Sequence, residues 1–127
     1  MATSNIELIR KWYETLDPEF LDEDIDWRLA EGFPADGHYR GRKPVFEEWW
    51  PKLAALFDEW KATPERLLDG GEAVVTLGNY TGVAKATGRR FKVPFVHIWW
   101  IRDGKIVKFD HHTNTLLLHR IVTEPAE

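Results

Sequence analysis

The chain has 127 residues, a formal net charge of -4 and 43% hydrophobic residues, which predicts a single globular domain over residues 1–127. The acidic balance argues against nucleic acid as the main partner. The absence of cysteine excludes disulfides, thiolate metal sites and a cysteine nucleophile. No run approaches the roughly 20 apolar residues of a membrane span, and the first residues form no apolar signal region. We therefore expect a cytoplasmic protein with no membrane partner.

The first half of the chain predicts a helix, a strand and a second helix. Residues 4–7, SNIE, match a capping box, and the apolar residues that follow have helical spacing. Residues 25–29 alternate between apolar and polar, which is typical of a strand. A second amphipathic helix is expected to begin near Pro44 and to extend to Trp60. Pro51 lies inside it, so we expect a bend just before this proline or two abutting helices.

The second half predicts long antiparallel strands. They are expected near residues 65–68, 72–86, 90–102 and 105–115, separated by glycine-containing turns. The apolar run 116–122 fits either a short helix or the end of a strand. This order predicts an α+β fold in which a long curved antiparallel sheet wraps over N-terminal helices. Such a cone has one mouth, and seven tryptophans and seven phenylalanines are enough to line a cavity as well as fill a core.

The turn at Asp103-Gly104 decides which side chains share a face of the sheet. Asp-Gly between alternating apolar runs predicts a type I′ hairpin. If Arg102 pairs with Lys105, one face carries a titratable group among apolar residues: Val96, Ile98, Trp100, Val107, Phe109 and His111. The other face carries Trp99 and would stay exposed, so we expect a homodimer through the sheet face that bears Trp99. A β-bulge in the last strand is the alternative, and it would bring His112 inward.

These faces suggest candidates for chemistry. His111 can exchange a proton near neutral pH, because an imidazole has a pKa of about 6.5, and it is the predicted general base. Asn79 lies in an alternating run assigned to the inner face, where its amide would bind a carbonyl or enolate oxygen. Glu31 lies on a loop expected at the mouth and is the reserve base. The predicted ligand-binding residues are Trp12, Tyr39, Trp50, Val96, Ile98, Trp100 and Phe109.

The candidates also have structural interpretations, which remain open. His111 could be a strand histidine satisfied by a neighbour, and Asn79 could be an edge or bend residue. No His/Asp/Glu cluster has the spacing of metal ligands, and no nucleotide-binding motif is present. We therefore expect neither a metal nor a cofactor.

Several short motifs carry a resemblance to a known family. They are HYRGR at 38–42, ATGRRF at 86–91, PFVHIW at 94–99, RDGKIV at 102–107 and NT at 114–115. Together with the order of elements, they resemble the NTF2-like (cystatin-like) superfamily, in particular its SnoaL-like polyketide cyclase and ketosteroid-isomerase-related branch. This fold hosts isomerases, epoxide hydrolases, cyclases, dehydratases and pure binding domains, so the resemblance implies the fold more strongly than the activity.

The resemblance also implies where catalytic residues would lie. The tyrosine of the ketosteroid isomerases falls on Trp12 and their second acid on Val96, so we do not expect their mechanism; only Glu31 lies where their base falls. The aspartate that cyclases place on the last long strand falls on His111. The epoxide hydrolases use an acid near residues 77–81, where this chain has none.

We therefore expect a cofactor-free lyase, isomerase or cyclase that moves a proton on a small, mostly apolar carbonyl compound. His111 would move the proton, and Asn79 or a water would hold the developing oxyanion. The alternative is a non-catalytic protein that binds a small apolar or aromatic molecule. A third interpretation, an assembly domain, predicts a filled cavity.

Overall fold

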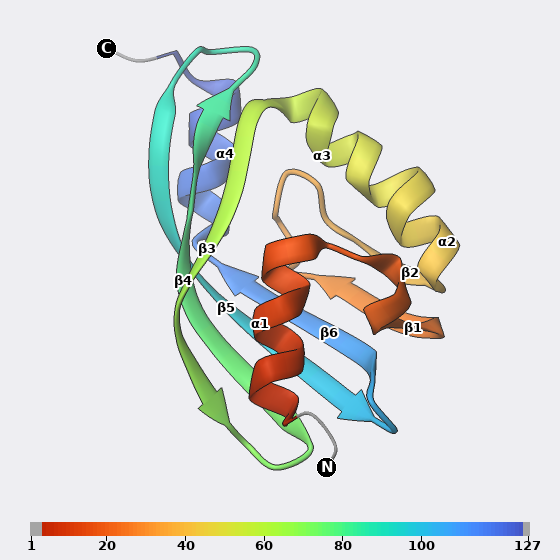
Figure 1. Cartoon of the computed structure of the whole chain (residues 1–127). Coiled ribbons are helices and arrows are strands. Elements are labelled where there is room, and N and C mark those ends of the chain that lie inside the picture. The colour runs from red at the N-terminus through yellow and green to blue at the C-terminus, as the bar shows by residue number, and fades with distance from the viewer. Residues whose placement is uncertain (1–3, 126–127) are drawn as a thin grey trace.

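A computed structural model describes residues 4–125, which form one curved, six-stranded sheet with helices packed against it (Figure 1). The helices are α1 (Asn5–Thr15), α2 (Arg42–Pro44), α3 (Trp50–Leu56) and α4 (Thr115–Thr123), with a 3-10 turn η1 (Pro18–Phe20) and a π-helical turn η2 (Val45–Trp49). The strands are β1 (Leu21–Leu29), β2 (Gly37–Arg40), β3 (Phe57–Asp69), β4 (Ala73–Ala84), β5 (Arg90–Arg102) and β6 (Lys105–Thr113). The predicted α+β cone is confirmed.

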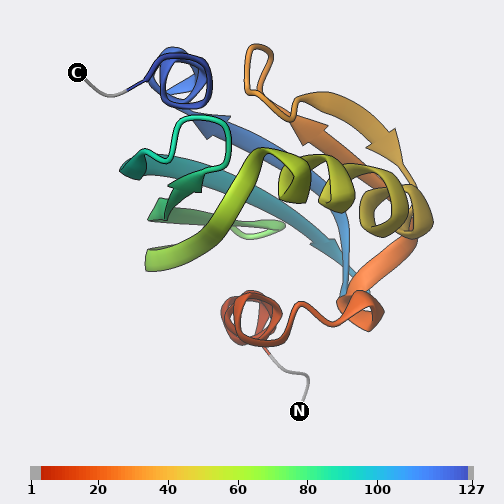
Figure 2. The ribbon, with the colours of Figure 1, turned by 90° about the horizontal axis from the view of Figure 1, so that it is seen from above.

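The strand order is β2-β1-β6-β5-β4-β3, and every neighbouring pair is antiparallel except β1 and β6, which are parallel. Seen from above, the strands curve around α3, while α1 and α4 lie at opposite ends of the view (Figure 2). The last apolar run is a helix, α4, in which Asn114 accepts a hydrogen bond from the Leu117 backbone N–H. Within residues 4–125, no helix combines the length and the apolar character that crossing a membrane requires.

Ser4 is the N-cap of α1 as predicted, but only half of the capping box forms among the described residues, because the Glu7 carboxylate accepts from Arg10 instead. The Ser4 hydroxyl accepts a hydrogen bond from the Glu7 backbone N–H at 3.2 Å, which satisfies one of the donors that a helix N-terminus leaves free. The helix ends at Leu16, whose φ of 52° is unusual for a residue with a side chain. In this conformation the Leu16 backbone N–H donates to the Trp12 carbonyl, which closes the last turn of the helix.

The second helix is irregular where Pro51 predicts a bend, but it ends earlier than expected. Because proline has no backbone N–H, Pro51 cannot complete an α-helical hydrogen bond. The preceding residues instead form the π-helical turn η2, closed by the Trp50 N–H and the Val45 carbonyl. The helix stops at Leu56, so its predicted extension to Trp60 is wrong. A β-bulge near Phe57 lets this residue and Trp60 both face inward from a strand, which imitates helical spacing.

The hairpin forms as predicted at its tip but not along its length. Asp103 and Gly104 have positive φ angles of 50° and 74°, and Arg102 pairs with Lys105. Val107 is then an extra residue in β6, so that the pairing passes from Ile101–Ile106 to Trp100–Lys108. A bulge of this kind shifts the faces of all later pairs.

The consequence is that the predicted inner face is wrong for β5. The concave face carries Phe95, His97, Trp99 and Ile101, all buried, together with Phe109 and His111 of β6. Val96, Ile98 and Trp100 lie on the convex face. His111 still faces inward, but its cross-strand neighbour is His97 rather than Val96.

The sheet face expected to form a homodimer also has to be corrected. Trp99 is only 1% exposed, because its side of the sheet packs against the helices. The convex face instead bears a patch of partly buried apolar side chains: Val75, Leu77, Val96, Ile98 and Trp100. The homodimer itself stays a prediction, with this convex patch in place of the face that bears Trp99.

If the convex patch forms the dimer, Ile98→Lys is expected to weaken association at least tenfold, because Ile98 lies between Val75 and Trp100 in the patch and the change places a charge in the apolar contact. Sedimentation velocity over a concentration series measures the change. Ala55→Lys, on the exposed side of α3, adds the same charge elsewhere and should leave association unchanged. A wild-type protein that stays monomeric at the highest concentration would contradict the dimer.

Candidate functional site

A cavity of about 210 Å³ lies between the helices and the concave face of the sheet. Six of the seven tryptophans are among its thirteen lining residues, with Tyr13, Tyr80, His97 and Phe109. An engineered apolar cavity of about 150 Å³ is large enough to hold benzene. This cavity is therefore suited to a small ligand with one or two rings.

The π-helical turn explains how two consecutive tryptophans line the same cavity. Successive residues of an α-helix point about 100° apart, whereas the wider turn before Pro51 alters the angle between Trp49 and Trp50. Their rings meet edge to face with centroids 4.9 Å apart. The Trp49 indole N–H donates to the Ala35 carbonyl at 2.8 Å, which holds the loop after β1 against the helix.

The polar centre of the cavity wall is His97, held between two tyrosines. Its Nδ1 atom lies 2.6 Å from the Tyr13 hydroxyl oxygen, and its Nε2 atom lies 2.6 Å from the Tyr80 hydroxyl oxygen. The Trp99 indole N–H donates to the Tyr13 hydroxyl at 3.0 Å. The three polar side chains come from α1, β5 and β4, so they meet only in the folded protein.

Burial keeps all three groups uncharged near neutral pH. It lowers the pKa of His97 well below its usual value, and nearby His111 lowers it further. It raises the pKa of Tyr13 and of Tyr80 above the usual range for tyrosine. A neutral imidazole has one N–H donor and one acceptor nitrogen. His97 therefore donates to one tyrosine and accepts from the other. Exchanging these roles would pass a proton from one tyrosine through His97 to the other.

His111 faces inward but is not among the residues that line the cavity. Its Nδ1 atom accepts a hydrogen bond from the Ala30 backbone N–H at 3.1 Å, so the proton of the neutral ring is on Nε2. Within residues 4–125, Nε2 has no hydrogen-bond partner, and the ring packs against Phe33 with centroids 4.7 Å apart. Burial, followed by the nearby His112, lowers the pKa of His111 to about 3. In this position His111 secures the end of β1.

The other two predicted catalytic residues also lie outside the cavity. Asn79 is on the convex face, because the buried positions of β4 are those of Thr76, Gly78 and Tyr80; its amide donates to the Glu65 carboxylate. Its predicted inner-face position is therefore wrong. Glu31 is exposed in the turn after β1 and is not a lining residue.

The predicted ligand-binding residues divide in the same way. Trp12, Trp50 and Phe109 line the cavity. Tyr39 lies on β2, half-buried against the core and outside the lining. Val96, Ile98 and Trp100 face the opposite side of the sheet, because the bulge at Val107 shifts the pairing of β5 and β6.

Sequence reasoning missed His97, Tyr80 and Tyr13 as a group. The alternation in the first half of β5 contains a signal that could have found His97. Phe91, Val93 and Phe95 have the same parity as His97, whereas Arg90, Lys92 and Pro94 have the opposite parity. The alternation of these six residues therefore predicts that His97 lies on the apolar face of the strand. For Tyr13 and Tyr80 we find no comparable signal, since their convergence depends on how α1 packs against the sheet.

Within residues 4–125, no group of three or more His, Asp or Glu side chains is placed to bind a metal ion. Among the described residues, Lys61 is the only charged one in the lining, and alternation along β3 directs its side chain away from the face that Trp60 and Ala62 share. The wall as a whole can stack against a flat ligand and offer it hydroxyl groups that are linked through one imidazole.

Comparisons with known proteins agree with this architecture. The family model of the SnoaL-like domain matches residues 9–109. An NTF2-like protein from Burkholderia thailandensis is 26% identical, with a TM-score of 0.86 over 94% of this chain and 98% of that chain. An NTF2-like protein from Burkholderia pseudomallei is 25% identical, with a TM-score of 0.87 over 96% and 99%. No curated protein matches the chain.

A third similar structure is TerC, co-crystallised with polyporic acid. It is 23% identical, with a TM-score of 0.82 over 93% of this chain and 97% of that chain. At this identity the similarity shows the fold alone.

Proposed function

Because the chain belongs to the SnoaL-like family of NTF2-like proteins, we propose that it is a cofactor-free enzyme moving a proton on a small aromatic carbonyl compound, by tautomerisation or cyclisation. The observation that carries this proposal is the pair of 2.6 Å hydrogen bonds that hold His97 between Tyr13 and Tyr80 in the cavity wall. These residues replace His111 and Asn79, which do not line the cavity, as the candidates for chemistry.

Tyr13, His97 and Tyr80 form a proton relay, which can exchange protons with a substrate at two points. In one arrangement Tyr80 donates to His97, His97 donates to Tyr13, and the Tyr13 proton is free for a substrate carbonyl. Tyr13 passes its proton to the carbonyl oxygen as the C–H bond at the α-carbon breaks and that proton moves to Tyr80. His97 gives its Nδ1 proton to Tyr13 and takes the Tyr80 proton on Nε2, so every group is neutral before and after the step.

Burial of the relay favours such a neutral exchange. Charging His97 is costly in this wall, since its pKa is well below the usual value. A proton that enters at one tyrosine as another leaves at the second avoids this cost. The Trp99 N–H bonded to Tyr13 would stabilise negative charge that develops on that oxygen.

Exchange of α-protons in β-tetralone, a two-ring enolisable ketone, tests this proposal. The purified protein in deuterium oxide is expected to accelerate deuterium incorporation at the α-carbon, followed by proton NMR, above buffer and above an equal concentration of albumin. Binding without any acceleration, seen as a ligand-induced rise in melting temperature, would contradict catalysis.

That contrary outcome would support the second candidate function, a binding protein for a small apolar ligand. One observation favours it: none of the thirteen lining residues is an aspartate or glutamate, the side chains that most often serve as bases alongside histidine. The two functions share the cavity and differ in whether the relay reacts.

A further inference from the structure

We propose that Leu16 sets the width of the cavity mouth, so that the site admits flat two-ring ligands and excludes those with a bulky group on the outer ring. This inference rests on the proposed function for the position of the ligand, whose oxygen meets the relay, and it narrows the substrate class by shape. It does not depend on whether the relay catalyses a reaction.

The mouth of the cavity lies where its lining residues reach solvent. Seven of the thirteen lining residues are buried and form the inner part of the wall. The other six come from the C-terminal end of α1, the start of α3 and the edge strand β3: Tyr13, Leu16, Trp50, Trp60, Lys61 and Ala62. Leu16 is the only exposed apolar residue among them, so it marks the outer rim.

Leu16 has a backbone conformation that does not suit a leucine. Its φ of 52° and ψ of 35° lie in the left-handed region, where helices more often end with glycine because a side chain crowds the backbone. The side chain is not buried in return, since it is 41% exposed. Neither the backbone nor the core therefore accounts for a leucine here, whereas its place in the cavity lining does.

The end of α1 directs the Leu16 side chain to the mouth. The Leu16 N–H donates to the Trp12 carbonyl at 2.8 Å, and in a left-handed helix end of this kind the last residue packs against the residue four positions before it. That residue, Trp12, is 1% exposed and lines the cavity. The chain just beyond is also held, because the Asp17 N–H donates to the Thr15 hydroxyl at 3.2 Å. Leu16 therefore forms a fixed rim beside Trp12.

A ligand that bonds to the relay extends past Leu16. Tyr13 lies three residues earlier on the chain, a rise of about 4.5 Å along a helix axis, which is close to the width of one aromatic ring. A two-ring ligand whose oxygen meets Tyr13 therefore places its outer ring beside Leu16. A flat ring fits beside the leucine, whereas a branched substituent on it overlaps with the side chain, and such overpacking is costly.

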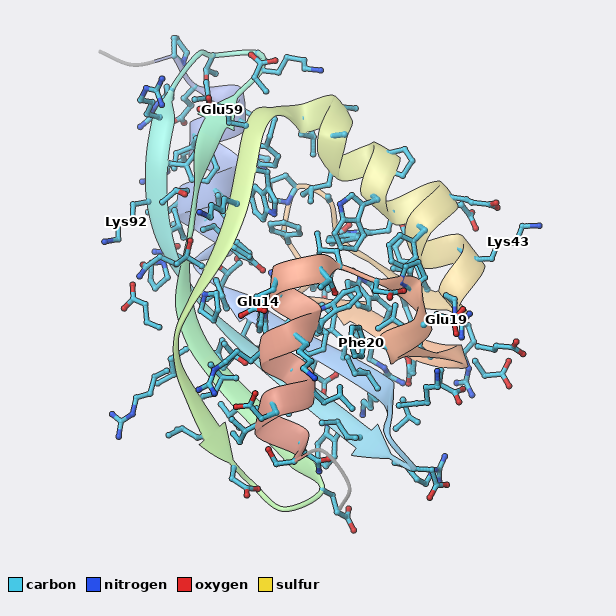
Figure 3. All side chains as sticks on the ribbon, in the orientation of Figure 1. Glu14, Glu19, Phe20, Lys43, Glu59 and Lys92 are labelled. Carbon is cyan, nitrogen blue, oxygen red and sulfur yellow. The ribbon has the colours of Figure 1, made fainter. Side chains whose placement is uncertain are left out.

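Charge does not select the ligand at this mouth. Among the described residues, no carboxylate lines the cavity, and the Lys61 side chain is directed to the other face of the sheet. Lys43 and Lys92 extend away from the molecule (Figure 3). The shape of an apolar side chain therefore decides which ligands enter.

Two phenols with the same two-ring body test the inference: β-naphthol, and a β-naphthol that carries a tert-butyl group on the ring without the hydroxyl. Calorimetric titration measures both dissociation constants. We expect the wild type to bind β-naphthol at least about tenfold more tightly than the tert-butyl derivative, because the overlap with Leu16 outweighs the added apolar contact. Leu16→Ala should reduce this preference to about twofold or less and keep the affinity for β-naphthol within about threefold of the wild type.

Leu68→Ala is the matched control. Leu68 is 39% exposed, close to the 41% of Leu16, but it lies near the end of β3 outside the lining, so this variant should keep the preference. Leu16→Met preserves most of the side-chain volume and should also keep it. Leu16→Gly should lose the preference as Leu16→Ala does, yet melt at a higher temperature than the alanine variant, because glycine suits the left-handed backbone.

Three results would overturn the inference: equal binding of both phenols to the wild type, a preference that survives Leu16→Ala, or failure of β-naphthol to bind. The exchange of β-tetralone protons is measured separately. Loss of the shape preference therefore leaves the proposed function standing, and loss of exchange leaves the preference standing.

Discussion

Replacing Tyr80 with phenylalanine is expected to slow α-proton exchange in β-tetralone about a hundredfold, the low end of what positioned acid–base groups contribute. The change removes only the hydroxyl oxygen that lies 2.6 Å from His97 Nε2 and keeps the aromatic ring against Trp60. Without that oxygen the relay has one point of contact with the substrate instead of two. Affinity for the ketone should change little, because the ring still lines the cavity.

A matched control separates catalysis from stability. Tyr39→Phe makes the same chemical change at a half-buried tyrosine outside the cavity and should keep the wild-type exchange rate. Tyr80→Phe also leaves a buried nitrogen of His97 unpaired, which costs about 1–3 kcal/mol of folding free energy, so exchange is compared only at temperatures where circular dichroism shows both variants folded.

The second tyrosine gives an independent check on the relay. Tyr13→Phe should slow exchange to a similar extent, and the Tyr13/Tyr80 double variant should be little slower than either single variant, because residues acting as one unit are not additive. A Tyr80→Phe protein with at least half of the wild-type exchange rate would rule out the relay.

The free energy of unfolding is expected to fall by at least about 2 kcal/mol between pH 7 and pH 5, because His111 is buried in its neutral form. Its pKa is about 3 in the folded protein and returns to about 6.5 on unfolding. Between these two pKa values the unfolded chain binds one more proton than the folded protein. The contribution of His111 to stability is therefore fully present above pH 6.5, and it is lost as the pH falls towards the pKa of the folded state. His97, whose pKa is also lowered by burial, adds a loss of the same sign.

Urea unfolding at several pH values measures this loss. His111→Asn offers a side-chain oxygen to the Ala30 N–H but does not titrate, so its stability should depend less steeply on pH over this window. His119→Asn changes an exposed histidine on α4 that does not act on His111, and it is the control. Partial burial raises the pKa of Asp26, but its hydrogen bonds to Arg28 and His38 outweigh this effect, so that the pKa is lowered overall. The stabilisation by Asp26 is therefore lost only at more acidic pH. A flat profile from pH 7 to pH 5 would contradict the buried neutral histidines.

Local sequence determined much of the backbone. The N-cap at Ser4, the Asp103-Gly104 turn and the disturbance before Pro51 each follow from the preferences of a few adjacent residues, and each is present in the structure. The order of helices and strands, and with it the α+β cone of the SnoaL-like family, was predictable for the same reason. The inward direction of His111 could also be predicted, since it follows from alternation within β6.

Local patterns therefore predict which segments form helices and strands, and the many tryptophans and phenylalanines predict an aromatic cavity. How the polar groups of the cavity meet depends on the packing of distant segments. One extra residue at Val107 put His97 opposite His111 in the sheet, and the packing of α1 brought Tyr13 to the His97 imidazole. A bulge depends on how two strands pair and a helix contact on how distant surfaces fit, so neither is encoded in the period of a single segment.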